Sequence, residues 1–256
     1  MTSCLPAHGR VACTLCFPNE SVEFDRSTTE GDGWRITANP MAWGTVEPEI
    51  VVLGFSKGPT QAGALSTFPH DEIAYKGSRK NVGKILAHIG LMPPGTSDQL
   101  ERSVNRLISD RHGRFHFSSF IRCTVERFDS KEQTWEGSGG GMLDRFVGTR
   151  FGSAVANRCA SRFLGGLPPS VRLVVMFGLG TKLNYVASAF SVFRAVRPGA
   201  WVKFKDVAYT DGQLMVVHVE HFASQGALIP DWLGTTGKPR ADFGKQAQEA
   251  VRTALA

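Results

Sequence analysis

The stretch that decides the fold is Glu49–Phe55, EIVVLGF, a short run of β-branched residues interrupted by Gly54. An apolar run of this length without alternation is typical of a strand buried on both faces. Three further runs predict strands: Phe115–Ile121, in which aromatic and polar residues alternate, and the apolar runs Arg172–Gly178 and Gln213–Val219. We therefore expect four strands in the core.

Between these runs the apolar residues take the spacing of helices. Lys80–Ile89 carries Val82, Ile85, Leu86 and Ile89, which lie on one face of a helix. Further helices are expected at Leu100–Ile108, Arg150–Leu164, Leu179–Phe193 and Ala241–Leu255. Strands separated by helices predict an α/β protein: a three-layer α/β/α arrangement with a central four-stranded parallel sheet. In such sheets ligands bind at the carboxyl ends of the strands.

The chain has 256 residues and a formal net charge of +6, with 42% hydrophobic and 20% charged residues. These proportions exclude a mostly disordered chain and favour one domain over residues 1–256, with an N-terminal cysteine segment at 1–48 and a glycine-rich insertion near 129–148. The apolar runs are too short to span a membrane, and the first residues lack the apolar segment of a signal peptide. We therefore expect a cytoplasmic protein.

The chain has five cysteines, at positions 4, 13, 16, 123 and 159. An odd number in a cytoplasmic chain argues against a disulfide framework. Cys13 and Cys16 form a C-x2-C pair, a spacing that suits zinc, an iron–sulfur cluster or a redox dithiol. With Cys4 and His8 the pair would complete a structural zinc site, and Cys123 and Cys159 would then be ordinary buried thiols.

Several motifs follow one another along the chain. They are the Cys13–Cys16 pair, the run Gly54-Phe-Ser-Lys-Gly58 after the first strand, Tyr75-Lys-Gly77 before a helix, the strand that leads into Cys123, the helix that carries Cys159, the strand LVVMFG, and Glu220-His-Phe-Ala-Ser224. This order resembles that of the uracil-DNA glycosylase superfamily, most closely its iron–sulfur branch (the family 4 type), over nearly the whole chain. The resemblance implies a uracil-DNA glycosylase-like fold.

The same resemblance implies a 4Fe–4S cluster on four of the cysteines, Cys13, Cys16, Cys123 and Cys159. Thiolates are the usual protein ligands of such a cluster. Because the ligands come from the N-terminus and from the middle of the chain, the cluster would tie remote segments together and serve a structural role. The local zinc site on Cys4, His8, Cys13 and Cys16 remains the alternative.

The resemblance further implies an enzyme of DNA repair, which acts on DNA that contains uracil or another deaminated base. A monofunctional glycosylase flips the base into a pocket, hydrolyses its N-glycosidic bond and leaves an abasic site. His221 matches the histidine that donates a hydrogen bond to the base as negative charge develops. Asp71 and Glu72 are alternative candidates for positioning the attacking water. A monomer suffices for this chemistry, and no membrane partner is expected.

Base contacts are expected from five residues near the strand ends. Gly54, Phe55 and Ser56 would line the base and the sugar, Tyr75 would stack on the base, and Ser119 would face the base edge. Contacts to the DNA itself are expected from Lys57, a phosphate partner, and from the loop after the histidine, in which Ser224, Gln225 and Leu228 resemble the superfamily's minor-groove wedge.

Three departures from the superfamily's motifs leave a second function open. Phe55 replaces an acidic residue, Ser119 replaces an asparagine that contacts the uracil edge, and Phe222 replaces a proline. A serine hydroxyl rotates and both donates and accepts, so we expect weaker discrimination among uracil, hypoxanthine and xanthine. The alternative is a catalytically inactive protein of the same fold that binds damaged or single-stranded DNA. A different α/β hydrolase acting on a small nucleoside is a third hypothesis.

Overall fold

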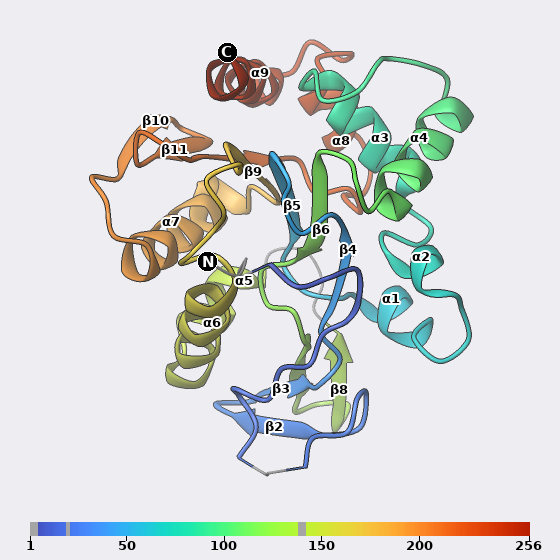
Figure 1. Ribbon diagram of the computed structural model, residues 1–256, viewed down its shortest axis with the longest axis vertical. Coiled ribbons are helices and arrows are strands. Elements are labelled where there is room, and N and C mark those ends of the chain that lie inside the picture. Colours follow the sequence, from blue (N-terminus) through green and yellow to red (C-terminus); the bar gives the residue numbers. More distant parts are fainter. Residues whose placement is uncertain (1–4, 19–20, 138–141) are drawn as a thin grey trace.

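The computed structural model describes residues 5–18, 21–137 and 142–256, and it has a mixed α/β architecture (Figure 1). Its larger sheet has eight strands in the order β1-β4-β6-β5-β9-β12-β11-β10. The strand bounds are β1 Gly9–Arg10, β4 Met41–Gly44, β5 Ile50–Gly54, β6 Phe115–Ser119, β9 Leu173–Phe177, β10 Val202–Lys205, β11 Ala208–Thr210 and β12 Met215–Val219.

The sheet is mixed. β6, β5, β9 and β12 pair in parallel, whereas β1 and β4 at one edge and β11 and β10 at the other pair antiparallel. The register sets Gly54 opposite Ser119 and Phe177 opposite Val219, so the four parallel strands end at the same edge. Every residue of β5, β9 and β12 is buried, which agrees with the unbroken apolar runs of the sequence.

A second sheet of four strands, in the order β2-β3-β7-β8, lies at the far end of the molecule from α9 (Figure 1). Its strands pair antiparallel throughout, and their bounds are β2 Thr28–Gly31, β3 Trp34–Thr37, β7 Thr124–Asp129 and β8 Thr134–Gly137. β3 buries Trp34 and Ile36 on one face, so this sheet contributes to the same core as the larger one.

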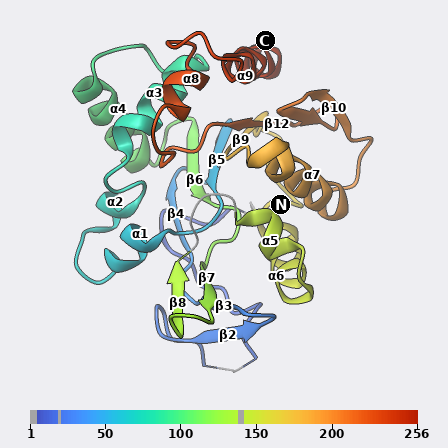
Figure 2. The ribbon, with the colours of Figure 1, turned by 180° about the vertical axis from the view of Figure 1, so that it is seen from behind.

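The helices gather in two groups on opposite sides of the parallel strands in both views (Figures 1 and 2). One group is α1 Pro59–Gly63, α2 His70–Ile73, α3 Arg79–His88 and α4 Ser97–Ser109. The other is α5 Leu143–Val147, α6 Arg150–Phe163 and α7 Asn184–Val196, which a short 3-10 turn at Thr181–Leu183 precedes. α8 Leu228–Trp232 and α9 Ala241–Leu255 follow the last strand.

Local chemistry explains where several helices begin. Thr96 caps α4 in a capping box with Gln99, and the Thr149 hydroxyl accepts from the backbone N–H of Gly152 at the start of α6. Pro59 opens α1, where its missing N–H removes no helical bond. None of the helices in the described part of the chain has the length and apolarity to cross a membrane.

The expected α/β class is confirmed, but the expected sheet of four strands is too small. The N-terminal cysteine segment 1–48, in which no strand was expected, contributes β1 to β4, and α1 and α2 follow β5 where no helix was expected. Most of the region near 129–148 is the β7–β8 hairpin and α5; residues 138–141 within it lie outside the described residues. None of these missed strands carries an unbroken β-branched run like those of β5, β9 and β12.

Candidate functional site

Four cysteines from remote parts of the chain line one small cavity, which we call the cysteine site. Cys13 and Cys16 follow β1, Cys123 follows β6, and Cys159 lies in α6. All four are free thiols and partly buried. The remaining cavity wall is largely apolar, with side chains from β3, α6 and the segment after β6. The fold therefore gathers the four cysteines that the resemblance names as ligands.

Two buried cationic residues accompany the cysteine site. Lys57 is 2% exposed and its Nζ donates to the carbonyl oxygen of Arg122, which is 1% exposed. The backbone N–H of Arg122 lies 3.5 Å from the Cys159 sulfur. Burial lowers the pKa of Lys57 to about 8, and the charges of Cys123 and Cys159, if ionised, oppose that shift. A buried cation is costly without a negative partner, so this environment suits thiolates bound to metal.

As free thiols, Cys16, Cys123 and Cys159 stay protonated at neutral pH. Burial, with smaller contributions from neighbouring Cys159 and Cys13, raises the pKa of Cys16 to about 11. Burial likewise raises the pKa of Cys123 to about 12 and raises that of Cys159. The ligands would therefore release protons on binding a metal, which makes metal binding depend on pH.

The four cysteine sulfurs are spaced more widely than the ligands of a single zinc ion. Four thiolates at about 2.3 Å from one zinc ion lie about 3.8 Å apart. Among the described residues, only one group of three or more histidine, cysteine, aspartate or glutamate side chains has its ligand atoms within 4.8 Å of one another. That group is His8, His70 and Asp71. No three of the four cysteine sulfurs therefore lie as close together as the ligands of one tetrahedral ion. Cys4, part of the zinc alternative, lies outside the described residues.

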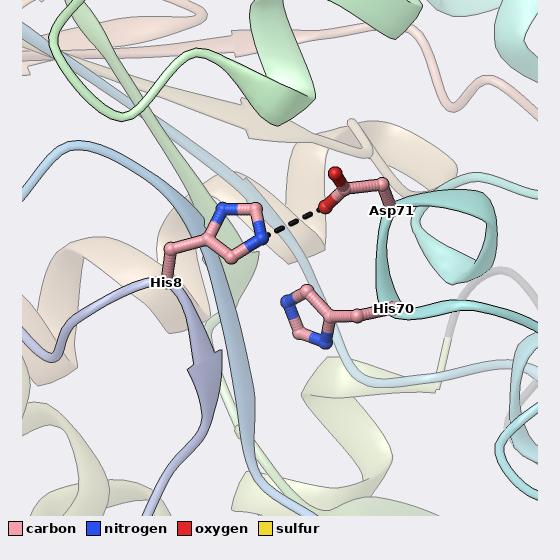
Figure 3. Close-up of side chains that lie close together, drawn as sticks. All are labelled: His8, His70 and Asp71. Carbon is pink, nitrogen blue, oxygen red and sulfur yellow. Dashed lines mark ion pairs between the residues drawn. The ribbon is translucent and has the colours of Figure 1, made fainter.

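His8, the other member of the zinc alternative, belongs to a different group (Figure 3). Its Nε2 lies 2.8 Å from Oδ1 of Asp71, and its ring centroid lies 4.7 Å from that of His70. The backbone N–H of Gly44 donates to His8 Nδ1 at 3.3 Å, and His70 Nε2 lies 2.9 Å from the Ala42 carbonyl oxygen. An imidazole that accepts at Nδ1 carries its proton at Nε2, so the neutral His8 points an N–H toward Asp71. This arrangement ties β1, β4 and α2 together.

A second group of predicted residues meets at the carboxyl ends of the parallel strands, and we call it the strand-edge site: Gly54, Tyr75, Ser119, His221 and Phe222. Gly54 and Ser119 are register partners at the ends of β5 and β6. The Phe222 ring lies 5.0 Å from that of Tyr75 and 4.4 Å from that of His221, and a Cβ atom on Gly54 would meet it at 4.0 Å. The site therefore joins three strand ends and the segment after α2.

His221 is held as a neutral hydrogen-bond donor. The backbone N–H of Ala223 donates to its Nδ1 at 3.2 Å, so the proton of the neutral ring is on Nε2. Burial lowers the pKa of His221 to about 4, although neighbouring Glu220 opposes that shift. At neutral pH the ring is therefore uncharged and presents an N–H, which is the form needed to stabilise developing negative charge on a ligand oxygen.

Glu220 organises the loop that carries His221, and sequence reasoning did not single it out. It is 2% exposed and accepts hydrogen bonds from the His221 backbone N–H at 3.0 Å, the Ser224 hydroxyl at 2.7 Å and Arg240 Nε at 2.5 Å. From α3, the Asn81 side-chain amide donates to the Phe222 carbonyl oxygen at 3.0 Å. A carboxylate directly after a buried strand was the available signal for Glu220; Arg240 and Asn81 had none.

Several predicted site residues lie elsewhere. Phe55 packs into the core, with its ring 5.9 Å from Phe146 and 6.2 Å from Tyr185. Asp71 contacts His8, which binds Gly44, and Gly44 pairs with His116 near the amino end of β6, away from the carboxyl edge. These positions do not bring Phe55 or Asp71 into the strand-edge site.

The remaining predictions divide by exposure. Lys57 donates to the carbonyl oxygen of Arg122, which lines the cysteine site, and its burial does not fit the expected phosphate contact. Ser56 is partly buried and Glu72 is exposed. Ser224 belongs to the Glu220 network, whereas Gln225 is exposed and Leu228 is 39% exposed, as a segment that contacts DNA requires.

Comparison with known proteins gives no relative: no family model matches the chain, and no curated protein matches it.

Proposed function

We propose that this chain is a monofunctional DNA glycosylase of the uracil-DNA glycosylase type, which hydrolyses the N-glycosidic bond of a deaminated base and leaves an abasic site. The observation that carries the proposal is the neutral His221, whose ring proton is on Nε2 and whose ring stacks on Phe222, which in turn contacts Tyr75 and borders Gly54. The partner is DNA, and one copy of the chain is sufficient.

The proposal includes the finer fold, a three-layer α/β/α arrangement around four parallel strands. The parallel pairing of β6, β5, β9 and β12 supports it, as do the two helix groups on opposite sides of those strands. The antiparallel strands at both edges would then be additions to a four-stranded centre.

In this mechanism His221 stabilises the leaving base. Cleavage leaves positive charge on the sugar and negative charge on the base, as in other glycoside hydrolysis. The Nε2–H of His221 donates to the base oxygen as that charge grows, and Glu220 holds the loop so that the donor is in place beforehand. The Ser119 hydroxyl contacts the base edge, and Gln225 and Leu228 support the flipped state from the exposed loop.

We further propose that Cys13, Cys16, Cys123 and Cys159 hold a 4Fe–4S cluster. When bound, it supplies thiolate–iron bonds that join the N-terminal segment, the end of β6 and α6. Lys57 and Arg122 offset part of its negative charge from their buried positions.

A second function, binding of damaged or single-stranded DNA without catalysis, is favoured by two observations. Asp71, the carboxylate expected to position water, is in contact with His8 and outside the strand-edge site. Phe55, which stands where the superfamily has an acidic residue, lies in the core.

An excision assay tests the proposal. The purified, metal-loaded protein is incubated with labelled duplexes that carry uracil, hypoxanthine or xanthine, and alkali then cuts any abasic site. We expect cleavage by the wild type and a loss of about 100- to 1,000-fold in His221→Ala. His112→Gln is the matched control, because His112 is exposed and outside both sites. Salt-sensitive DNA binding without cleavage would instead establish the non-catalytic function.

A further inference from the structure

The side chain of Phe222 occupies the centre of the strand-edge site. Its ring lies 5.0 Å from the Phe177 ring and 5.0 Å from the Tyr75 ring, edge-to-face against both, while the His221 ring is stacked on it at 4.4 Å. Gly54 borders the same space and has no side chain to fill it. The result is a slot that one six-membered aromatic ring fills.

Tyr75, which forms one wall of this slot, has two features that lower the stability of the fold. Its backbone has φ of +52°, a left-handed conformation that non-glycine residues rarely adopt. Its side chain is 4% exposed, and its buried hydroxyl has no hydrogen-bond partner among the described residues. An unmade buried hydrogen bond costs about 1–3 kcal/mol. Strain and unsatisfied polar groups concentrate at functional sites, so the walls of the slot indicate a ligand.

Phe222 is attached in a way that lets its ring leave. The Asn81 amide binds the Phe222 backbone carbonyl oxygen, so rotation about the side-chain bonds breaks no hydrogen bond. The side chain is only partly buried, and the loop beyond it, residues 225–228, is exposed. Gly226, with φ of +64°, turns the backbone there. The ring can therefore swing toward solvent while His221 and the backbone stay in place.

We propose that the slot between Tyr75 and Phe177 is the binding site for the six-membered ring of a flipped pyrimidine, and that Phe222 fills it until the base enters. The inference rests on the proposed function and narrows its substrate class. A pyrimidine has the ring size of a phenyl group, whereas a purine carries a second fused ring. Because the Phe222 ring already stands at van der Waals distance from the Gly54 wall, uracil fits the slot better than hypoxanthine or xanthine, and this replaces the weaker discrimination expected from Ser119.

The test is calorimetric binding of three free compounds, uracil, hypoxanthine and benzene, to the wild type and to Phe222→Ala. If the Phe222 side chain fills the slot about 90% of the time, it weakens ligand binding about tenfold. Its removal is therefore expected to tighten uracil binding about tenfold. Benzene is the control for binding by shape alone, because a cavity left by a removed phenyl group binds benzene without any polar contact. In Phe222→Ala we expect uracil to bind more tightly than benzene or hypoxanthine.

The contribution of polar side chains to uracil binding is measured in the Phe222→Ala variant. Adding Ser119→Ala or His221→Ala to Phe222→Ala is expected to abolish the gain for uracil and to leave benzene binding unchanged. Phe68→Ala is the matched control, because Phe68 is an exposed phenylalanine that the structure places in contact with Lys76 and outside the slot. Thermal melting verifies folding, and Phe222→Leu, with a smaller loss of packing, replaces the alanine variant if that one does not fold.

Three results overturn the inference: benzene binding without uracil binding, no binding of either, or weaker uracil binding in the opened variant than in the wild type. The last would make Phe222 a stacking partner of the base. The excision assay is scored separately. If the protein binds uracil but excises no base, only the proposed glycosylase function is refuted. If it excises a base but Phe222→Ala does not bind uracil more tightly than the wild type, only the proposed role of Phe222 is refuted.

Discussion

The cysteine site and the strand-edge site were predicted with the same motifs and differ in how completely they assemble. All four predicted cysteines line one cavity, although they are drawn from β1, β6 and α6 neighbourhoods. At the strand edge, Gly54, Tyr75, Ser119 and His221 come together, while Phe55 and Asp71 turn elsewhere. The difference teaches that residue type predicted the site better than position in a loop did. Cysteines have one dominant chemistry, whereas the role of a loop residue such as Phe55 or Asp71 depends on the direction of its side chain.

The largest expected effect breaks the cysteine site. Cys159→Ser removes a ligand in α6, and we expect complete loss of bound iron and of visible absorption. The accompanying loss of stability should be comparable to the whole folding free energy of a domain, about 5–15 kcal/mol. Iron and sulfide analysis with far-ultraviolet circular dichroism measures both. Chelation of iron from the wild type should have the same result.

Cys4→Ser is the matched control for that prediction, because Cys4 belongs to the zinc alternative and not to the proposed cluster. It should leave iron content unchanged. A zinc-loaded wild type whose zinc is lost in Cys4→Ser, with Cys159→Ser unaffected, would contradict the cluster and establish the local zinc site.

The second prediction concerns two buried histidines of the larger sheet, His116 in β6 and His218 in β12. Burial and the Arg122 charge lower the pKa of His116 to about 3, and burial lowers that of His218 to about 4. Both rings are neutral in the folded and unfolded chain above pH 6.5, and only the unfolded chain takes up their protons between about pH 6.5 and 4. Stability is therefore present above pH 6.5 and lost on acidification, by about 2 kcal/mol for each histidine between pH 7 and 5.

Urea unfolding at pH 7, 6 and 5 measures this loss. His116→Gln and His218→Gln should each flatten the pH dependence, and His112→Gln, at an exposed position, should not. A free energy of unfolding that stays constant from pH 7 to pH 5 would show that the two buried rings titrate like exposed ones.

The third prediction concerns the support of His221. Glu220→Gln removes the charge that Arg240 and the Ser224 hydroxyl bind, and it should lower the free energy of unfolding by about 2–3 kcal/mol. Excision should fall as well, because the His221 loop loses its anchor. A double-mutant cycle with Arg240→Gln measures the coupling; strictly additive effects would mean that the ion pair contributes nothing.

The smallest expected effect tests the wall of the slot. Tyr75→Phe removes a buried hydroxyl that lacks a partner among the described residues, and it should raise the free energy of unfolding by about 1 kcal/mol. Tyr209→Phe is the matched control, because the Tyr209 hydroxyl lies 3.2 Å from His218 Nε2 and its loss should lower stability by about 1 kcal/mol. Equal losses in both variants would show that the Tyr75 hydroxyl has a partner.

The sequence predicts the centre of the fold well because that centre is apolar throughout. Glu49–Phe55 was expected as a strand and β5 is Ile50–Gly54; the tail helix Ala241–Leu255 has the expected bounds. The edges of the sheet were not predictable. β1 has two residues and β11 three, and their pairing is fixed by neighbours distant in sequence and not by a pattern of their own.

The residues of the candidate site were predictable where residue type alone decides what a side chain does. Cysteines bind metals through thiolates wherever the backbone gathers them, whereas neighbouring Phe55 and Lys57 belong to one turn and face different surroundings. Nothing in the sequence marked Lys57 as buried, because lysine is mostly exposed in folded proteins. Its burial depends on Arg122, which lies 65 residues further along the chain.

The shortness of β1 has a consequence for solubility. β1 is a two-residue strand that covers the outer edge of β4, a strand whose four residues are all buried. Its hold on that edge comes from its own pairing, from the Val11 N–H donating to the Pro40 carbonyl oxygen, and from the Gly44 N–H donating to His8. Unpaired, buried strand edges recruit other chains. Release of the N-terminal segment would therefore expose a template for self-association before the parallel strands themselves open.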